Sequence, residues 1–134
     1  MKIKEFGQKH WREIVLALIA VLFFVSTSSF NHQTQEYMKV EGDIDFVKWL
    51  SPDETSNYIF AKLYAQTGNI SIQEDYNLYT KDIMHPRSFR SDFGTLKPVS
   101  FLGIILIYGK IASIFGYKII PYLTPLIAAV SIFF

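Results

Sequence analysis

Two adjacent carboxylates, Asp53 and Glu54, are the side chains of this sequence best suited to chemistry. A carboxylate can act as a general base that removes a proton from an acceptor hydroxyl or amine. A pair of carboxylates can instead hold a divalent cation through its oxygens. Arg87, Arg90 and Lys97 follow in the same polar segment and can receive a phosphate or diphosphate, arginine through its planar fork and lysine as a point charge.

Each of these side chains also has a purely structural interpretation. Carboxylates in the first turn of a helix interact favourably with the helix dipole, by a few tenths of a kcal/mol to about 1 kcal/mol. Cationic residues such as Lys97 commonly flank membrane helices at the interface. Arg87 and Arg90 can pair with acidic neighbours in the same segment, namely Glu74, Asp75, Asp82 and Asp92.

The acidic pair opens a segment that has the start and stop signals of a helix. Ser51 is a suitable N-cap, Pro52 suits the first helical position, and Glu54 has the capping-box spacing. Gly68 is placed to end the helix. The sequence therefore predicts a helix over about 52–67, too short and too polar to span a bilayer, which we expect to lie along the outer membrane face.

Two apolar blocks enclose this polar segment. Residues 14–30 carry no charge, and residues 99–134 carry only Lys110 and Lys118. A bilayer core of about 30 Å needs about 20 mostly apolar residues to cross as a helix. The sequence predicts an α-helical polytopic membrane protein with a mostly irregular stretch over 69–98. Its three transmembrane helices are expected over 14–30, 99–116 and 119–134, the last one incomplete because it is still apolar at its end.

The distribution of charge orients these segments. Residues 1–13 carry a net charge of +2, which places them in the cytoplasm, and residues 31–98 carry −3 and then form an extracytoplasmic loop. We therefore expect a multi-pass protein of the cell membrane. The absence of a basic stripe argues against a nucleic-acid partner. The absence of cysteine excludes disulfides, thiolate metal sites and a cysteine nucleophile.

The order of the motifs resembles the start of the GT-C membrane glycosyltransferases, most closely the branch of protein O-mannosyltransferases and lipid A aminoarabinose transferases. The resemblance covers residues 14–134. It rests on the acidic pair followed by Tyr58, on the helix-ending Gly68, on Lys97-Pro98, and on Phe115-Gly116 at the end of the second apolar helix.

That resemblance implies that Asp53 is the catalytic base and Glu54 its supporting neighbour. It also implies that Lys97 lies near the phosphate of a polyprenyl-phosphate sugar donor, and that the sugar passes to a protein or lipid acceptor outside the cytoplasm. Val99 replaces a second proline of the family's Lys-Pro-Pro element, and the gap between Glu54 and Lys97 is longer than in that pattern. His85-Pro86 is an alternative match to a His-Pro element of the mannosyltransferases.

Two other interpretations stay open at this point. The chain can be a small non-enzymatic membrane protein whose outer loop binds a partner subunit. It can also be a secreted domain with a cleaved leader and a C-terminal hairpin anchor, because the apolar run over 14–25 and the small residues after it fit a cleavable signal peptide as well as a membrane anchor.

Overall fold

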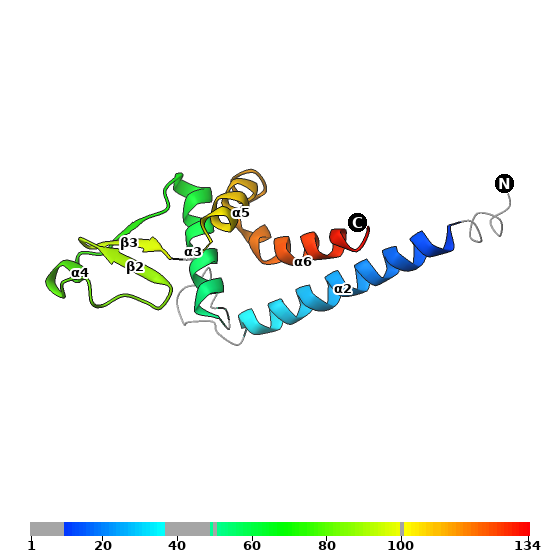
Figure 1. Cartoon of the computed structure of the whole chain (residues 1–134), viewed down its shortest axis with the longest axis horizontal. Helices are drawn as coiled ribbons and strands as arrows, with labels where there is room; N and C mark the ends of the chain where they lie inside the picture. The colour runs from blue at the N-terminus through cyan, green and yellow to red at the C-terminus, as the bar shows by residue number, and fades with distance from the viewer. Residues whose placement is uncertain (1–9, 37–48, 50, 100) are drawn as a thin grey trace.

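The computed structural model describes residues 10–36, 49, 51–99 and 101–134. The described part is mostly helical and contains a small sheet. The elements in chain order are α2 (Trp11–Glu36), α3 (Pro52–Thr67), β1 (Ile72–Gln73), α4 (Tyr76–Tyr79), β2 (Phe89–Asp92), β3 (Thr95–Pro98), α5 (Leu102–Phe115), a 3-10 turn η1 (Tyr117–Ile119) and α6 (Ile120–Ser131). The molecule is elongated, with α2 and α6 at one end, the sheet at the other, and α3 with α5 between them (Figure 1).

Helix α2 contains the one segment of the described residues, Trp11–Phe30, that is long and apolar enough to cross a membrane. At 1.5 Å per residue, its 26 residues extend over about 39 Å, more than a bilayer core of about 30 Å. Its large apolar side chains face outward: Leu22 is 65% exposed and Val21 is 59% exposed. A helix with this surface suits a lipid environment, and its range includes the first predicted span over 14–30.

The second and third predicted spans are not confirmed. Helix α5 has 14 residues and α6 has 12, which correspond to about 21 Å and about 18 Å. Gly116 separates α5 from η1 with a φ of 89°, a conformation that favours glycine. Helix α5 is viewed nearly end-on while α2 lies in the plane of the picture, so α5 crosses the direction of α2 (Figure 1). Helix α6 instead packs alongside α2.

Helix α5 packs closely on α3, at a small residue. A Cβ atom added at Gly109 would lie 2.7 Å from Cδ1 of Tyr64 and 3.0 Å from the carbonyl oxygen of Ala61. Helix α5 contains two glycines, Gly103 and Gly109, and small residues of this kind favour close packing of helices. In this structure the partner of Gly109 is the polar-segment helix α3, whereas Gly103 has open space around it.

The stretch over 69–98, which the sequence predicts to be mostly irregular, also contains an antiparallel sheet that the prediction missed, in the strand order β1-β3-β2. Strands β2 and β3 are joined by the two-residue turn Phe93-Gly94, and both residues have positive φ (49° and 74°), as a type I′ hairpin turn requires. Phe89 and Leu96 turn one face of this hairpin onto Phe60 of α3 and Ile105 of α5. The sheet is therefore anchored to the helices by a shared apolar core.

Candidate functional site

The start of α3 is fixed by local interactions that the sequence predicts. The hydroxyl of Ser51 accepts a hydrogen bond of 3.3 Å from the backbone N–H of Asp53, and Pro52 occupies the first helical position. At the other end, the N–H of Gly68 donates to the carbonyl of Tyr64 at 2.9 Å, with a φ of 75° at the glycine. The helix spans Pro52–Thr67, in agreement with the predicted range of 52–67.

The carboxylate of Asp53 has a partner far away in the sequence. The hydroxyl of Ser88 donates a hydrogen bond to Oδ1 of Asp53. Ser88 itself has a φ of 70°, a left-handed conformation that costs a residue other than glycine about 1–2 kcal/mol. Its carbonyl accepts hydrogen bonds from the hydroxyl of Ser56 at 3.0 Å and from the N–H of Val99 at 3.3 Å. These bonds hold the strained residue against the first turn of α3.

Asp53 opens onto a cavity of about 460 Å³, which we call the Asp53 cavity. Arg87 and Ser88 supply its other polar lining, and Val99 and Phe101 supply its apolar lining. Phe101 is 77% exposed, so the cavity has an open apolar side where the chain enters α5. Arg87 forms no ion pair with any carboxylate in the described ranges, so its guanidinium is available to an anion.

Glu54 opens onto a different cavity, of about 350 Å³, which we call the Glu54 cavity. Neighbouring residues of an α-helix point about 100° apart, which is why the two carboxylates diverge. Within the described residues, no three His, Cys, Asp or Glu side chains lie together in a way that could hold a metal ion. Asp53 and Glu54 line different cavities, so their carboxylates do not converge on one cation.

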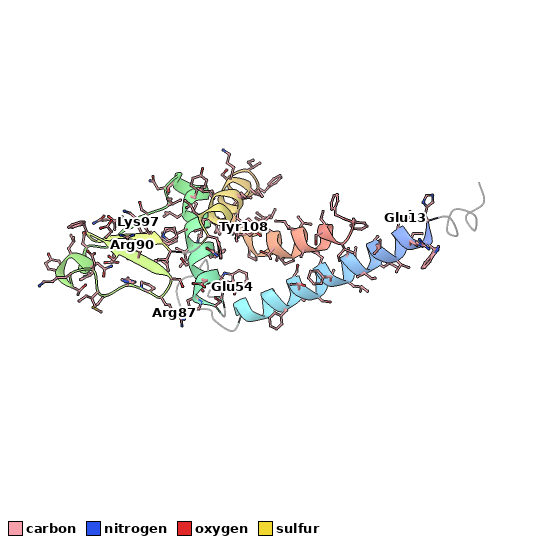
Figure 2. The ribbon with its side chains drawn as sticks, viewed as in Figure 1. Glu13, Glu54, Arg87, Arg90, Lys97 and Tyr108 are labelled. Carbon is pink, nitrogen blue, oxygen red and sulfur yellow. The ribbon has the colours of Figure 1, made fainter. Side chains whose placement is uncertain are left out.

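Of the three cations that the sequence singles out for a donor phosphate, only Arg87 lines the Asp53 cavity. Arg90 and Lys97 are register partners on β2 and β3 and lie together on the sheet, as Figure 2 shows. Lys97 forms an ion pair of 3.3 Å with Asp92. The structure thus divides the predicted set, with one arginine beside the predicted base and the other two cations on the neighbouring sheet.

Apart from Glu54 and Tyr58, the residues that line the Glu54 cavity belong to no motif that the sequence analysis identified. Trp49, Asn57 and Tyr108 line it, together with Tyr58 from the predicted motif. The hydroxyls of Tyr108 and Thr124 are 2.9 Å apart and join α5 to α6 beside the cavity. The spacing of the cavity residues in the sequence gives no signal. They come together because α3, α5 and α6 meet, and no local sequence pattern encodes how these helices cross.

The carboxylate of Asp82 stabilises the turn between β2 and β3. Its carboxylate accepts hydrogen bonds from the hydroxyl of Ser91 at 2.6 Å, from the N–H of Gly94 at 2.8 Å and from the N–H of Phe93 at 2.9 Å. The bond from Ser91, then the bond from Gly94, lower the pKa of Asp82 below its ordinary value of 3.8. Asp82 is therefore committed to the hairpin turn and is no partner for Arg87 or Arg90.

Comparison with known proteins gives no relative: no family model, no curated protein and no solved structure matches this chain. What the two cavities can do is therefore judged from the side chains that line them. The Asp53 cavity combines a carboxylate, a guanidinium and an open apolar side. The Glu54 cavity combines aromatic rings, an amide and a carboxylate.

Proposed function

We propose that this chain contributes the Asp53 cavity of a membrane glycosyltransferase. It would move a sugar from a polyprenyl-phosphate donor to a protein or lipid acceptor on the extracytoplasmic side. The observation that supports this most directly is that Asp53 and Arg87, which are 34 residues apart in the sequence, line one cavity. A general base and a phosphate-binding group are the two functions that such a transfer needs.

In the proposed reaction, an acceptor hydroxyl attacks C1 of the sugar from the face opposite the phosphate. The bond from the acceptor oxygen to C1 forms as the bond from C1 to the phosphate oxygen breaks. Asp53 takes the hydroxyl proton, and the phosphate leaves with the bonding electrons. Arg87 stabilises the charge on this leaving group through its bidentate fork. Ser88 donates to Oδ1 of Asp53, which orients the carboxylate and leaves its other oxygen for the acceptor.

The apolar surroundings suit a lipid-linked donor. Val99 and Phe101 line the Asp53 cavity and are 63% and 77% exposed. They lead into α5, whose large side chains are also exposed, Ile107 at 58% and Phe115 at 71%. An isoprenoid chain can lie on this apolar surface while its phosphate reaches Arg87. The same surface suits the bilayer, in which the second and third predicted spans would lie together with α2.

The test is transfer of labelled sugar from a panel of polyprenyl-phosphate sugars by the protein in its native membrane. Removing a general base costs about 100-fold to 10,000-fold in rate, so Asp53→Asn should lower transfer at least about 100-fold. Arg87→Ala should weaken donor use by about 10-fold to 100-fold, because a hydrogen bond to a charged group contributes about 1.5–3 kcal/mol.

Asp75→Asn is the matched control, because Asp75 is an exposed carboxylate of the same segment that lines neither cavity. Transfer should stay near normal in this variant. If Asp53→Asn retains a near-normal rate while Asp75→Asn behaves in the same way, Asp53 is not the base and the proposal fails.

A partner-binding role is the second candidate, and the distal end of the sheet region favours it. Large side chains are exposed there outside any predicted membrane segment: Tyr79 is 86% exposed, Phe93 is 82% and Ile83 is 78%. Exposed apolar groups that lie together commonly mark interaction sites. Under this alternative, Phe93→Ser with Tyr79→Ser abolishes a defined complex in native mass spectrometry, and Asp53→Asn leaves that complex intact.

A further inference from the structure

The Glu54 cavity contains a carboxylate that no described group neutralises. Glu54 is exposed, and within the described residues its side chain forms no ion pair and no hydrogen bond. It is not needed for the helix cap, because the backbone N–H of Asp53 already donates to Ser51. No lysine, arginine or histidine is among the described residues that line the cavity. The cavity therefore has one negative charge without a counter-ion.

Three hydroxyl groups line the same cavity. They belong to Thr27 of α2, Tyr108 of α5 and Thr124 of α6. Oη of Tyr108 and Oγ1 of Thr124 are 2.9 Å apart, so one donates to the other and both keep lone pairs for a further donor. Thr124 is exposed and Tyr108 is half-buried, so a ligand can reach both oxygens. Glu54 and Tyr108 come from different helices (Figure 2).

A carboxylate together with hydroxyl oxygens suits a primary ammonium group. Such a group carries one positive charge and three N–H donors and has no acceptor. The Glu54 carboxylate supplies the counter-charge and one acceptor, and the hydroxyls of Tyr108 and Thr124 supply further acceptors. Hydrogen bonds in which both the donor and the acceptor are charged are among the strongest in proteins.

Other ligand chemistries fit this lining less well. A phosphate would meet the Glu54 carboxylate with no described cation to offset the repulsion. A metal ion would find too few ligands, because no group of three His, Cys, Asp or Glu lies together in the described part of the chain. A quaternary ammonium has the charge but no N–H donor for the hydroxyls. The lining therefore favours a primary amine over these alternatives.

The cavity lies at one end of the candidate membrane span Trp11–Phe30. Thr27, which lines it, is within one helical turn of Phe30, about 4.5 Å along the helix axis. In a bilayer spanned by α2, this is the depth at which lipid headgroups meet acyl chains. The cavity volume of about 350 Å³ is enough for a headgroup but not for a whole lipid.

An apolar surface continues from the cavity along α2 and α6, which pack side by side (Figure 1). Phe23 is one turn from Thr27 and is 43% exposed. Ile127 is one turn from Thr124 and is 53% exposed. Residues three or four positions apart lie on the same side of a helix, so acyl chains can follow these side chains while the headgroup stays in the cavity.

We propose that the Glu54 cavity binds the primary ammonium headgroup of a membrane lipid. Glu54 is its counter-ion, Tyr108 and Thr124 accept its N–H groups, and the acyl chains lie on α2 and α6. Phosphatidylethanolamine has this chemistry. The lipid site goes beyond the proposed transfer, which uses the Asp53 cavity, and it depends on no step of that reaction.

The experiment is native mass spectrometry of the chain in detergent, titrated with phospholipids that have the same acyl chains and different headgroups. Phosphatidylethanolamine should bind at least about 5-fold more tightly than phosphatidylglycerol, and each N-methyl group added to its amine should weaken binding. Glu54→Gln has the same shape without the charge and should weaken phosphatidylethanolamine at least about 5-fold. Asp75→Asn, the matched loss of an exposed carboxylate that lines neither cavity, should leave it unchanged.

Thr124→Val removes only a hydroxyl at an exposed position and should weaken the lipid a few-fold, which tests the site even if Glu54→Gln does not fold. Equal binding of the three headgroups, or a preference for phosphatidylglycerol, would overturn the proposal. The same holds if Glu54→Gln binds phosphatidylethanolamine as tightly as the unmodified chain does. If free ethanolamine binds as tightly as the lipid, the occupant is a soluble amine and the assignment to a lipid is wrong.

Discussion

The contact between α3 and α5 predicts that Gly109→Ala separates the two helices that carry the cavity residues. The added Cβ would lie 3.0 Å from the backbone oxygen of Ala61, and ordinary van der Waals contact begins at 3.4 Å, so the backbones must part by about 0.4 Å. Rotation of the Tyr64 ring would relieve the contact of 2.7 Å, but it would not move the carbonyl of Ala61 or Cβ of Tyr64, which lies 3.1 Å from the new atom. The backbone contact therefore sets the minimum cost.

Two opposing terms give the magnitude. Overpacking a close contact costs about 1–3 kcal/mol, and replacing a mid-helix glycine by alanine gains about 1 kcal/mol in helix propensity. Gly109→Ala should therefore lower the free energy of unfolding by up to about 2 kcal/mol. Gly103→Ala on the same helix meets nothing within 4 Å and should leave it unchanged or raise it by at most about 1 kcal/mol.

Thermal unfolding of both variants in nanodiscs, followed by circular dichroism, measures this difference. Each kcal/mol shifts the Tm of a domain of this size by about 4 °C, so the two variants should differ by roughly 4–12 °C. Equal Tm values for Gly103→Ala and Gly109→Ala would refute the close approach of α3 and α5.

Three further predictions concern single side chains. The pKa of Asp82 is lowered in the folded protein, so the carboxylate stabilises the hairpin at pH values above the unfolded pKa of 3.8. This stabilisation is lost as the pH falls through the lower folded pKa, and amide exchange at Gly94 should accelerate in that pH range. Asp82→Asn should remove this dependence on pH. Ser88→Ala should lower kcat about 10-fold with little change in KM, because it removes the hydrogen bond that orients Asp53. Ser88→Gly should lower kcat by the same factor, but it should also raise the Tm, because glycine adopts the φ of 70° without strain. Lys97→Ala should change stability by less than about 1 kcal/mol, since its ion pair with Asp92 is 49% and 40% exposed, and should reduce transfer less than Arg87→Ala.

The sequence was most informative where the structure depends on neighbouring residues. The bounds of α3 follow from Ser51, Pro52 and Gly68, whose capping interactions are all made within the helix and its flanks. The exposed apolar surface of α2 follows from composition alone. By contrast, the hairpin of β2 and β3 is absent from the prediction because its strands have four residues each and its turn is Phe-Gly, in place of the usual Asn-Gly or Asp-Gly.

The predicted spans over 99–116 and 119–134 show that composition does not predict how an apolar helix is oriented or what it packs against. Apolar residues indicate that a segment avoids water, but they do not say which surface covers it. Gly109 and Ala112 are buried against α3, so a helix that hydropathy assigns to the bilayer has one face packed on the polar segment. The grouping of the cations could not be predicted either, because β-sheet register places Arg90 opposite Lys97, whereas Arg87 precedes β2 and lines the Asp53 cavity.

The position of Asp53 also bears on whether its carboxylate serves only the helix. The cap of α3 is completed by the backbone N–H of Asp53, which donates to Ser51, and an acidic side chain that interacts with the helix dipole needs no partner from another element. Here a hydrogen bond reaches Asp53 from a residue 35 positions away, and that residue, Ser88, adopts a strained conformation. Such strain persists where the surrounding contacts enforce it, and it is concentrated at functional sites. The helix dipole alone does not account for this hydrogen bond, and a fixed carboxylate beside Arg87 is what the proposed base requires.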